Sequence, residues 1–202
     1  MIRCLAHLFI FLYNRSMNNL IIITGDLAAG KSTLAHSLSE ELKIPCLIKD
    51  TLKEIACDAI GYETREENRA LSIAAVNSII YVFNQTAEVG GDLILEANFR
   101  KEEISAIKDI ADQYNYHVVL IKLTGDINLL YQRFLDRLSN RHIAHRSLNL
   151  DFSIERFAGY IQDIRNEDMI YPSHVIDMSE LDEDEVTEKA LGFIYDELGS
   201  IR

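Results

Sequence analysis

The sequence predicts an α/β fold in which helices cover both faces of a parallel sheet. Short apolar runs alternate along the 202 residues with longer segments whose apolar residues have helical spacing, and this alternation is typical of repeated strand–helix–strand units. The apolar runs are nearly continuous in Ile, Leu and Val, as strands are when both faces of a parallel sheet are covered. The two prolines, Pro45 and Pro172, lie at or just before such runs, where a missing N–H group costs little.

The expected strands and helices follow one another in regular order. The strand candidates are residues 20–24, 45–49, 92–96, 116–122 and 174–177. The helix candidates are residues 31–43, 51–60, 66–88, 101–114, 126–139, 154–168 and 183–198. Gly90 and Gly91 are expected to end the longest helix, because glycine readily adopts the backbone conformations that stop a helix. No internal repeat or linker is visible, so a single domain is expected.

Composition restricts the class of protein. Hydrophobic residues make up 48% of the chain, which is enough for a full core. The formal net charge is −12, and this disfavours a long nucleic-acid duplex as partner because phosphate contacts need clustered Lys and Arg. The three cysteines, Cys4, Cys46 and Cys57, form no C-x-x-C pair. Such cysteine usage fits a reduced, cytoplasmic protein.

Residues 1–16 differ from the rest of the chain. Their mostly apolar run, residues 5–13, is too short to span a bilayer as a helix, and no small-residue cleavage site follows it as in a signal peptide. Met17 directly precedes the first predicted strand. We therefore predict a domain of residues 17–202, with translation starting at Met17. An extension that packs on the domain and a membrane anchor are the alternatives for residues 1–16.

The most specific motif follows the first predicted strand. Residues 25–32 read Gly-Asp-Leu-Ala-Ala-Gly-Lys-Ser and fit G-x-x-x-x-G-K-[ST], the phosphate-binding P-loop, between a strand and a helix as this motif requires. Its glycines let backbone N–H groups turn toward phosphate oxygens, and the helix start adds a positive dipole end. The alternative is a glycine-rich turn before an ordinary helix. The residues expected to hold the nucleotide are Gly25, Asp26, Leu27, Ala28, Ala29, Gly30, Lys31, Ser32 and Thr33.

Polar residues follow the second and third strands, at the sheet edge where ligands of open α/β sheets bind. Asp50 could accept a proton from a substrate hydroxyl, and Lys53, one helical turn later, could contact the phosphoryl group. Glu96 ends its strand as the acid of a Walker-B strand does and could hold a Mg²⁺-bound water or a substrate group. Asn98 and Arg100 add polar contacts. The alternatives are that Asp50 only caps a helix and that Glu96 is structural.

The densest group of cations lies between residues 133 and 146. Arg133, Arg137 and Arg141 are four residues apart, so they share one face if a single helix carries all three. Arginines on a mobile segment stabilise the transition state of phosphoryl transfer, and a lid over residues 133–153 would exclude water. A solvated helix face is the alternative. The group also contains Arg146, His142 and His145; the histidines lack a third zinc ligand and are expected to shape the lid or contact the substrate.

Taken in order, these motifs resemble those of the small P-loop kinases of the polynucleotide-kinase-like group, to which zeta toxins and chloramphenicol phosphotransferase are related. The resemblance covers most of residues 17–180 and rests on Gly25-x4-Gly30-Lys31-Ser32, Asp50-x-x-Lys53, Glu96-Ala97-Asn98-Phe99 and the cations from Arg133 to His145. It implies a P-loop NTPase three-layer sandwich, a parallel five-stranded sheet of order 2-3-1-4-5 and a short helical lid.

The resemblance also implies roles for individual residues. Asp50 takes the position of the general base, and Arg137 and Arg141 take the positions of the lid arginines. Members of the group often carry arginine where this chain has Lys53, and lysine cannot grip a phosphate with two parallel hydrogen bonds as arginine does.

The sequence as a whole predicts an ATP-dependent kinase that uses Mg²⁺ to transfer the γ-phosphoryl group to a hydroxyl of a small molecule. Catalysis is expected from Lys31, Asp50, Arg137 and Arg141. The acceptor is expected to contact Asp50, Lys53, Glu96, Asn98 and Arg100. The metal is expected to contact Ser32 and Glu96.

Other functions remain open at this point. Two alternatives within kinases are a 5′-hydroxyl nucleic-acid kinase and a zeta-toxin-like kinase of nucleotide sugars. The alternative outside kinases is an ATPase switch without an acceptor. The chain lacks the Asn/Thr-Lys-x-Asp guanine motif of GTPases, and its acid beside a cationic lid favours a kinase. The acceptor, the oligomeric state and the preference for ATP over GTP are not predicted.

We predict that a protein starting at Met17 is soluble and as stable as the full chain, because residues 1–16 match no part of the kinase pattern. Thermal unfolding of both proteins tests this. A large loss of Tm on truncation would show that residues 5–13 pack against the domain.

Overall fold

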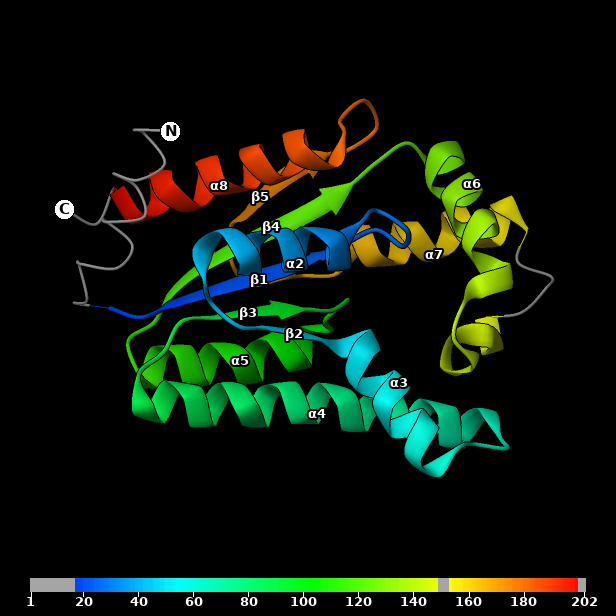
Figure 1. Cartoon of the computed structure of the whole chain (residues 1–202), viewed down its shortest axis with the longest axis horizontal. Helices are drawn as coiled ribbons and strands as arrows, with labels where there is room; N and C mark the ends of the chain where they lie inside the picture. The colour runs from blue at the N-terminus through cyan, green and yellow to red at the C-terminus, as the bar shows by residue number, and fades with distance from the viewer. Residues whose placement is uncertain (1–16, 149–152, 200–202) are drawn as a thin grey trace.

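The computed structural model describes residues 17–148 and 153–199, so residues 1–16 lie outside it. Five parallel strands form one sheet in the order β2-β3-β1-β4-β5, with helices on both faces (Figure 1). The strands are β1 (Asn19–Gly25), β2 (Cys46–Ile48), β3 (Leu93–Glu96), β4 (His117–Thr124) and β5 (Ser173–Asp177). The predicted fold class and strand order are confirmed.

The helices fall close to the expected segments. They are α2 (Lys31–Leu42), α3 (Lys49–Ile60), α4 (Arg65–Val89), α5 (Lys101–Gln113), α6 (Ile127–Arg137), α7 (Ile154–Asn166) and α8 (Glu183–Gly199), with two 3-10 turns, η1 (Leu138–Asn140) and η2 (Ile143–Leu148). Most helix boundaries differ from the predicted ones by one or two residues, and two of these differences bear on the site. α3 begins at Lys49, so Asp50 lies in its first turn and the N-cap is Ile48. α6 ends at Arg137 rather than at residue 139.

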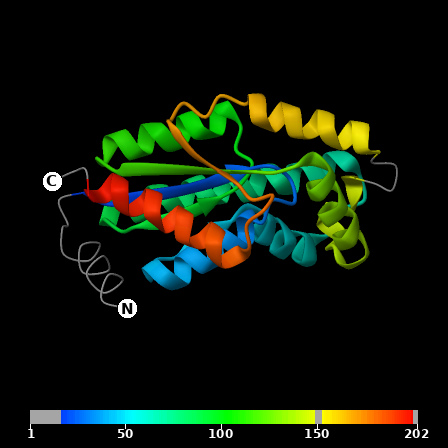
Figure 2. The same ribbon diagram turned by 90° about the horizontal axis from the view of Figure 1, so that it is seen from above.

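The central strand β1 is buried on both faces. Ile21 and Ile23 pack in the core formed with α2, α6, α7 and α8, whereas Leu20 and Ile22 pack in the core formed with α4 and α5. All four side chains are fully buried. In Figure 2, α2 and α8 lie on one side of the strands and α5 on the other. This two-sided burial explains why the strands are continuous in Ile, Leu and Val.

α4 spans 25 residues and covers the sheet beside α5. A capping box starts it, in which the Glu67 N–H donates to Thr64 Oγ1 at 3.1 Å and the Thr64 N–H donates to Glu67 Oε2 at 3.0 Å. Among the described residues, α4 is the one helix long and apolar enough to cross a bilayer by length and composition. Here Ile79 and Phe83 pack it onto the sheet, as in the core helix of an α/β protein.

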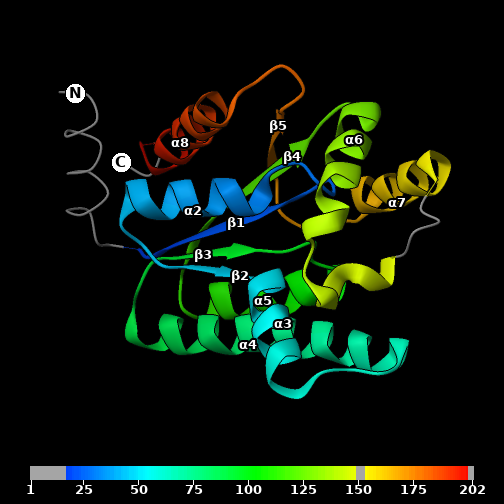
Figure 3. The ribbon, with the colours of Figure 1, turned by 45° about the vertical axis from the view of Figure 1, so that its right-hand side comes forward.

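The segments that follow the strands gather at the carboxyl edge of the sheet. The P-loop follows β1, α3 follows β2, and the start of α5 follows β3. Residues 133–153, which we call the lid, comprise the end of α6, η1, η2 and residues 149–152, the last of which lie outside the described part. Figure 3 shows α6 and η2 beyond this edge of the sheet, and η2 packs against α3 and α4.

A buried ion pair ties the P-loop to α7. The Asp26 side chain is 0% exposed, and Arg165 donates to its carboxylate from Nε at 3.1 and 3.2 Å and from Nη2 at 2.6 Å. Thr124 Oγ1 and the Gly125 N–H donate to the same carboxylate at 3.0 and 3.3 Å. Arg165 Nη2 also donates to the Gly125 carbonyl at 2.7 Å. The ends of β1, β4 and α7 therefore meet at one carboxylate.

We predict that Arg165→Met lowers the free energy of unfolding by about 3 kcal/mol, because it leaves the Asp26 charge buried without its ionic partner. Urea unfolding measures this loss. The double variant Asp26→Asn/Arg165→Met should recover part of it, since no unpaired charge remains buried. An equal loss in the single and double variants would contradict this interpretation.

Candidate functional site

The loop after β1 has the backbone of an anion-binding site. Gly25 has φ +127°, and a Cβ atom there would collide with the backbone of Leu123, so only glycine fits. Gly30, with φ +84°, is the N-cap of α2. Because Gly30 has no side chain to cap the helix, the first N–H groups of α2 face the loop and can bind an anion. Residues 25–33 span the end of β1, this loop and the first turn of α2, but the side chain of Asp26 turns toward Arg165.

Lys31 lies at the centre of the site. Its ammonium donates to the backbone carbonyl of Asp26 at 2.7 Å, which places the charge over the loop. Burial lowers the pKa of Lys31, although the negative charges of Glu96, Asp50 and Asp26 oppose this effect. Since all three carboxylates are close enough to interact with it, Lys31 links the phosphate loop to the acids of the neighbouring strands.

Ser32 and Glu96 form a pair of oxygen ligands beside Lys31. The Ser32 hydroxyl donates to Glu96 Oε2 at 3.1 Å. Glu96 is 4% exposed, and burial raises the pKa of this carboxyl despite the nearby Lys31 charge. Mg²⁺ prefers hydroxyl, carboxylate and water oxygens. The structure thus brings together the two residues predicted to contact the metal.

Asp50 is a carboxylate open to solvent and surrounded by cations. Its side chain is 47% exposed, and Lys49 Nζ lies 3.5 Å from Oδ1. Burial alone would raise the pKa of Asp50, but the charges of Lys49, His145, Lys31 and Arg141 outweigh it and the pKa is lowered. Asp50 is therefore ionised at neutral pH and can accept a proton. It lies in the first turn of α3 but is not its N-cap.

Lys53 has a different environment from the one expected for a phosphoryl contact. It is 6% exposed, and its ammonium donates to Asn68 Oδ1 at 2.7 Å and to the Ala144 carbonyl at 2.8 Å. Asn68 Nδ2 donates to the same carbonyl at 3.0 Å. Lys53 thus connects α3, α4 and the lid. Sequence reasoning missed Asn68, because nothing in its local sequence marks a residue that meets a loop 76 positions away.

A single helix does not carry Arg133, Arg137 and Arg141, so the condition under which the three would share one face is not met. α6 ends at Arg137, and Arg141 follows η1 on extended backbone. Ser139 and Asn140 account for the end of the helix, because their side chains compete for backbone hydrogen bonds. Arg141 nevertheless reaches the site: its guanidinium lies 5.6 Å from the centroid of the Phe134 ring, and the Asp50 charge acts on it.

Histidines of the lid bind acids of α3. His142 Nε2 lies 3.0 Å from Asp58 Oδ1, and His145 Nε2 lies 2.9 Å from Glu54 Oε1. Tyr62 also donates to the Ile143 carbonyl at 2.7 Å. These contacts hold the lid against α3, as expected of histidines that shape a lid. The side chain of the remaining predicted cation, Arg146, lies outside the described part.

The site opens into a cleft of about 1190 Å³. The P-loop, the start of α3, the first turns of α4 and the lid line it. Asn98 and Arg100 belong to its wall. Arg100 pairs with Glu167 at 3.3 Å, and Asn98 Oδ1 is buried without a hydrogen-bond partner in the described part of the chain. The larger cleft therefore contains every predicted catalytic and acceptor residue.

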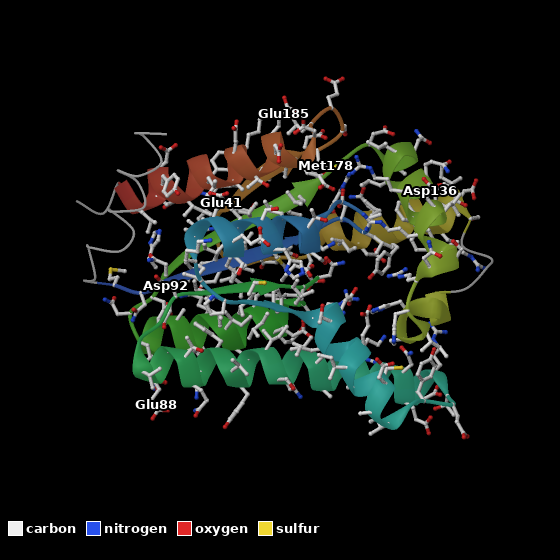
Figure 4. The ribbon with its side chains drawn as sticks, in the orientation of Figure 1. Glu41, Glu88, Asp92, Asp136, Met178 and Glu185 are labelled. Carbon is white, nitrogen blue, oxygen red and sulfur yellow. The ribbon has the colours of Figure 1, made fainter. Side chains whose placement is uncertain are left out.

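A smaller cleft of about 470 Å³ lies on the other side of Arg137 and shares Gly30 and Thr33 with the larger one. Its walls include Arg133 and Leu181. Figure 4 labels two further wall residues, Asp136 on α6 and Met178 after β5. Arg133 Nη1 contacts Met178 Sδ at 3.4 Å. The smaller cleft thus has a partly apolar wall that carries two arginines and three acids, and it lies beside the larger polar cleft.

We predict that Glu96→Gln raises the Tm of the nucleotide-free protein at about pH 7.5. A carboxyl whose folded pKa is raised contributes its full stability below its unfolded pKa and loses it as pH rises through the folded value. The gain in Tm should therefore shrink toward about pH 4.3, the ordinary pKa of glutamate. Thermal unfolding across this range measures it. Glu188→Gln, at an exposed acid of α8, is the control; an unchanged Tm in Glu96→Gln at every pH would overturn the prediction.

Solved structures share this fold. A provisionally assigned kinase from Chloroflexus aurantiacus J-10-fl has a TM-score of 0.71 and 23% identity, over 88% of this chain and 99% of that one. A gluconokinase from Sinorhizobium meliloti 1021 has a TM-score of 0.60 and 15% identity, over 93% and 97%. A tunicamycin resistance protein from Deinococcus radiodurans has a TM-score of 0.57 and 16% identity, over 88% and 95%.

The family is shown by a separate comparison. No curated protein matches the chain. The zeta toxin family model, however, matches residues 12–186, which include the P-loop, Asp50, Glu96 and the lid. This stretch is most of the chain, and the resemblance expected from the sequence is confirmed. The chain belongs to the zeta toxin family.

Proposed function

We propose that the protein is an ATP-dependent kinase that transfers the γ-phosphoryl group to a hydroxyl group of a small molecule. The observation that carries this proposal is Asp50, an ionised and half-exposed carboxylate beside the P-loop lysine and a lid arginine. A general base for a hydroxyl acceptor needs these properties. A nucleotide switch without an acceptor has no need of a second open carboxylate there.

The two clefts suggest how the nucleotide binds. The smaller cleft offers the apolar side chains Met178 and Leu181 and the guanidinium of Arg133, which suit the flat face of a nucleotide base. The larger cleft receives the phosphates, because Lys31 and the first N–H groups of α2 lie there. Arg137 lines both clefts and can follow the triphosphate between them.

Ser32 and Glu96 fit a Mg²⁺ ion that arrives with ATP, since their oxygens already contact each other. When bound, such an ion neutralises charge on the phosphate oxygens. Burial raises the pKa of Glu96, and the charge of the ion would favour the ionised form of this carboxyl.

In the proposed transfer, the acceptor oxygen bonds to the γ-phosphorus as the bond from phosphorus to the bridging oxygen breaks. ADP leaves with the electron pair, and Asp50 takes the hydroxyl proton. Arg137 and Arg141 stabilise charge on the transferring group. The lid contacts of His142 and His145 help to exclude water, which would otherwise compete as acceptor.

A transfer screen tests the proposal. The protein is incubated with ATP labelled on the γ-phosphate, Mg²⁺ and nucleosides, sugars, amino alcohols or 5′-hydroxyl oligonucleotides. A labelled organic product supports a kinase and identifies the acceptor, including the nucleic-acid and nucleotide-sugar alternatives. Labelled inorganic phosphate alone, with no labelled product in any reaction, would favour the ATPase switch instead.

We predict that Asp50→Asn lowers the rate of transfer by roughly 10²- to 10⁴-fold, the range of general base catalysis. Asparagine is nearly isosteric but cannot take the proton. ATP affinity, measured by titration, should stay within a few-fold, because Asp50 contacts the acceptor. Asp163→Asn, at an exposed acid of α7, should leave both quantities unchanged. Near-normal transfer by Asp50→Asn would shift the role of base to Glu96.

A further inference from the structure

The larger cleft is cationic although the protein is acidic. Eight of the chain's 20 Lys and Arg line it, against six of the 32 Asp and Glu. Lys31, Arg137 and Arg141 lie where the nucleotide phosphates are proposed to bind. The remaining five lie on the acceptor side, so phosphate binding at the P-loop does not explain them.

Three of these five cations already have partners. Lys53 is buried against Asn68 and the Ala144 carbonyl. Arg100 pairs with Glu167, and Lys49 pairs with Asp50. The other two, Arg65 and Arg69, form no ion pair or hydrogen bond from their side chains within the described part of the chain.

Arg65 and Arg69 lie on one face of α4. They are four residues apart in its first two turns, so their side chains are neighbours, and both line the cleft. Arg65 is the first residue of α4, where the helix dipole disfavours a cation. Helix stability therefore does not account for it. The nearest acid on the same helix is Glu66, which also lines the cleft.

One hydrogen bond joins the helix of the proposed base, α3, to the helix of the arginine pair, α4. Lys53 lies one helical turn after Asp50 on α3 and donates to Asn68. Asn68 lies one turn after Arg65 and directly before Arg69 on α4. Asp50, Arg65 and Arg69 line the same cleft, so a ligand that fills it meets Asp50 on the α3 side and the arginines on the α4 side.

We infer that the acceptor carries an anionic group, a carboxylate or a phosphate, which Arg65 and Arg69 bind while Asp50 faces the hydroxyl. Arginine suits this role because its planar guanidinium donates two parallel hydrogen bonds to either group. The inference rests on the proposed function and narrows its acceptor to anionic hydroxyl compounds. It also makes Arg65 and Arg69 determinants of substrate specificity.

The test compares acceptors that share a hydroxyl framework and differ in charge: a sugar, its aldonate and its monophosphate. The wild-type protein should transfer better to one anionic member than to the neutral sugar. Arg65→Gln/Arg69→Gln should raise KM for that anionic acceptor by about 10- to 100-fold, the loss expected for charge-assisted hydrogen bonds. KM for ATP should stay within a few-fold. Arg156→Gln, at an exposed arginine of α7 outside the cleft, should behave as wild type.

A binding measurement separates this inference from the proposed function. Calorimetric titration of an aldonate and of a hexose monophosphate is carried out with Mg²⁺ and ADP saturating the P-loop. Binding that the double variant loses and Arg156→Gln retains supports the anion site even if no acceptor is phosphorylated, and the kinase proposal then fails alone. Three results would overturn the inference. They are equal transfer to neutral and anionic acceptors, a double variant that loses transfer to both acceptors equally, and no binding of the anions when ADP occupies the P-loop.

Discussion

The carboxylate of Asp26 is fully buried, and its hydrogen bonds determine how the P-loop meets the rest of the protein. A buried charge is costly unless it is paired and hydrogen-bonded. Here Arg165, Thr124 and Gly125 all donate to it, so the end of β1, the end of β4 and the end of α7 cannot move independently. The same residue accepts from Lys31 through its backbone carbonyl. The position of the P-loop lysine thus depends on an interaction made behind the loop.

A second group of contacts determines the shape of the larger cleft. Lys53 and Asn68 share the Ala144 carbonyl, which fixes the lid to α3 and α4. The lid in turn brings His145 and Arg141 near Asp50. Burial would raise the pKa of Asp50, but the charge of Lys49, together with those of these two lid residues, lowers it. Lys53 therefore contributes to the site by holding the lid in place, with its ammonium bound to Asn68 and the Ala144 carbonyl. Lysine suits this role, because its ammonium fits between two oxygen acceptors in a buried space.

Local sequence patterns predicted most of the fold and the centre of the site. The strands were predictable because two-sided burial leaves continuous apolar runs, and the P-loop was predictable because its geometry demands glycines at fixed positions.

The residues that sequence patterns missed depend on distant contacts. Arg165 is 139 positions from Asp26, and Ala144 is 91 positions from Lys53. α6 ends at Arg137, two residues before the predicted boundary, and Ser139 and Asn140 just beyond it have weak helix propensity. Arg65 and Arg69 were missed because an exposed arginine pair on a helix is common, and only the cleft gives it meaning.

The central claim is that the nucleotide crosses the P-loop with its γ-phosphate directed at Asp50. A crystal structure with a non-hydrolysable ATP analogue and Mg²⁺ tests this claim most directly. We expect the base in the smaller cleft beside Arg133, the γ-phosphate against Lys31, and the Asp50 carboxylate beyond it with space for a hydroxyl between them. A base bound in the larger cleft, or a γ-phosphate directed away from Asp50, would contradict the claim.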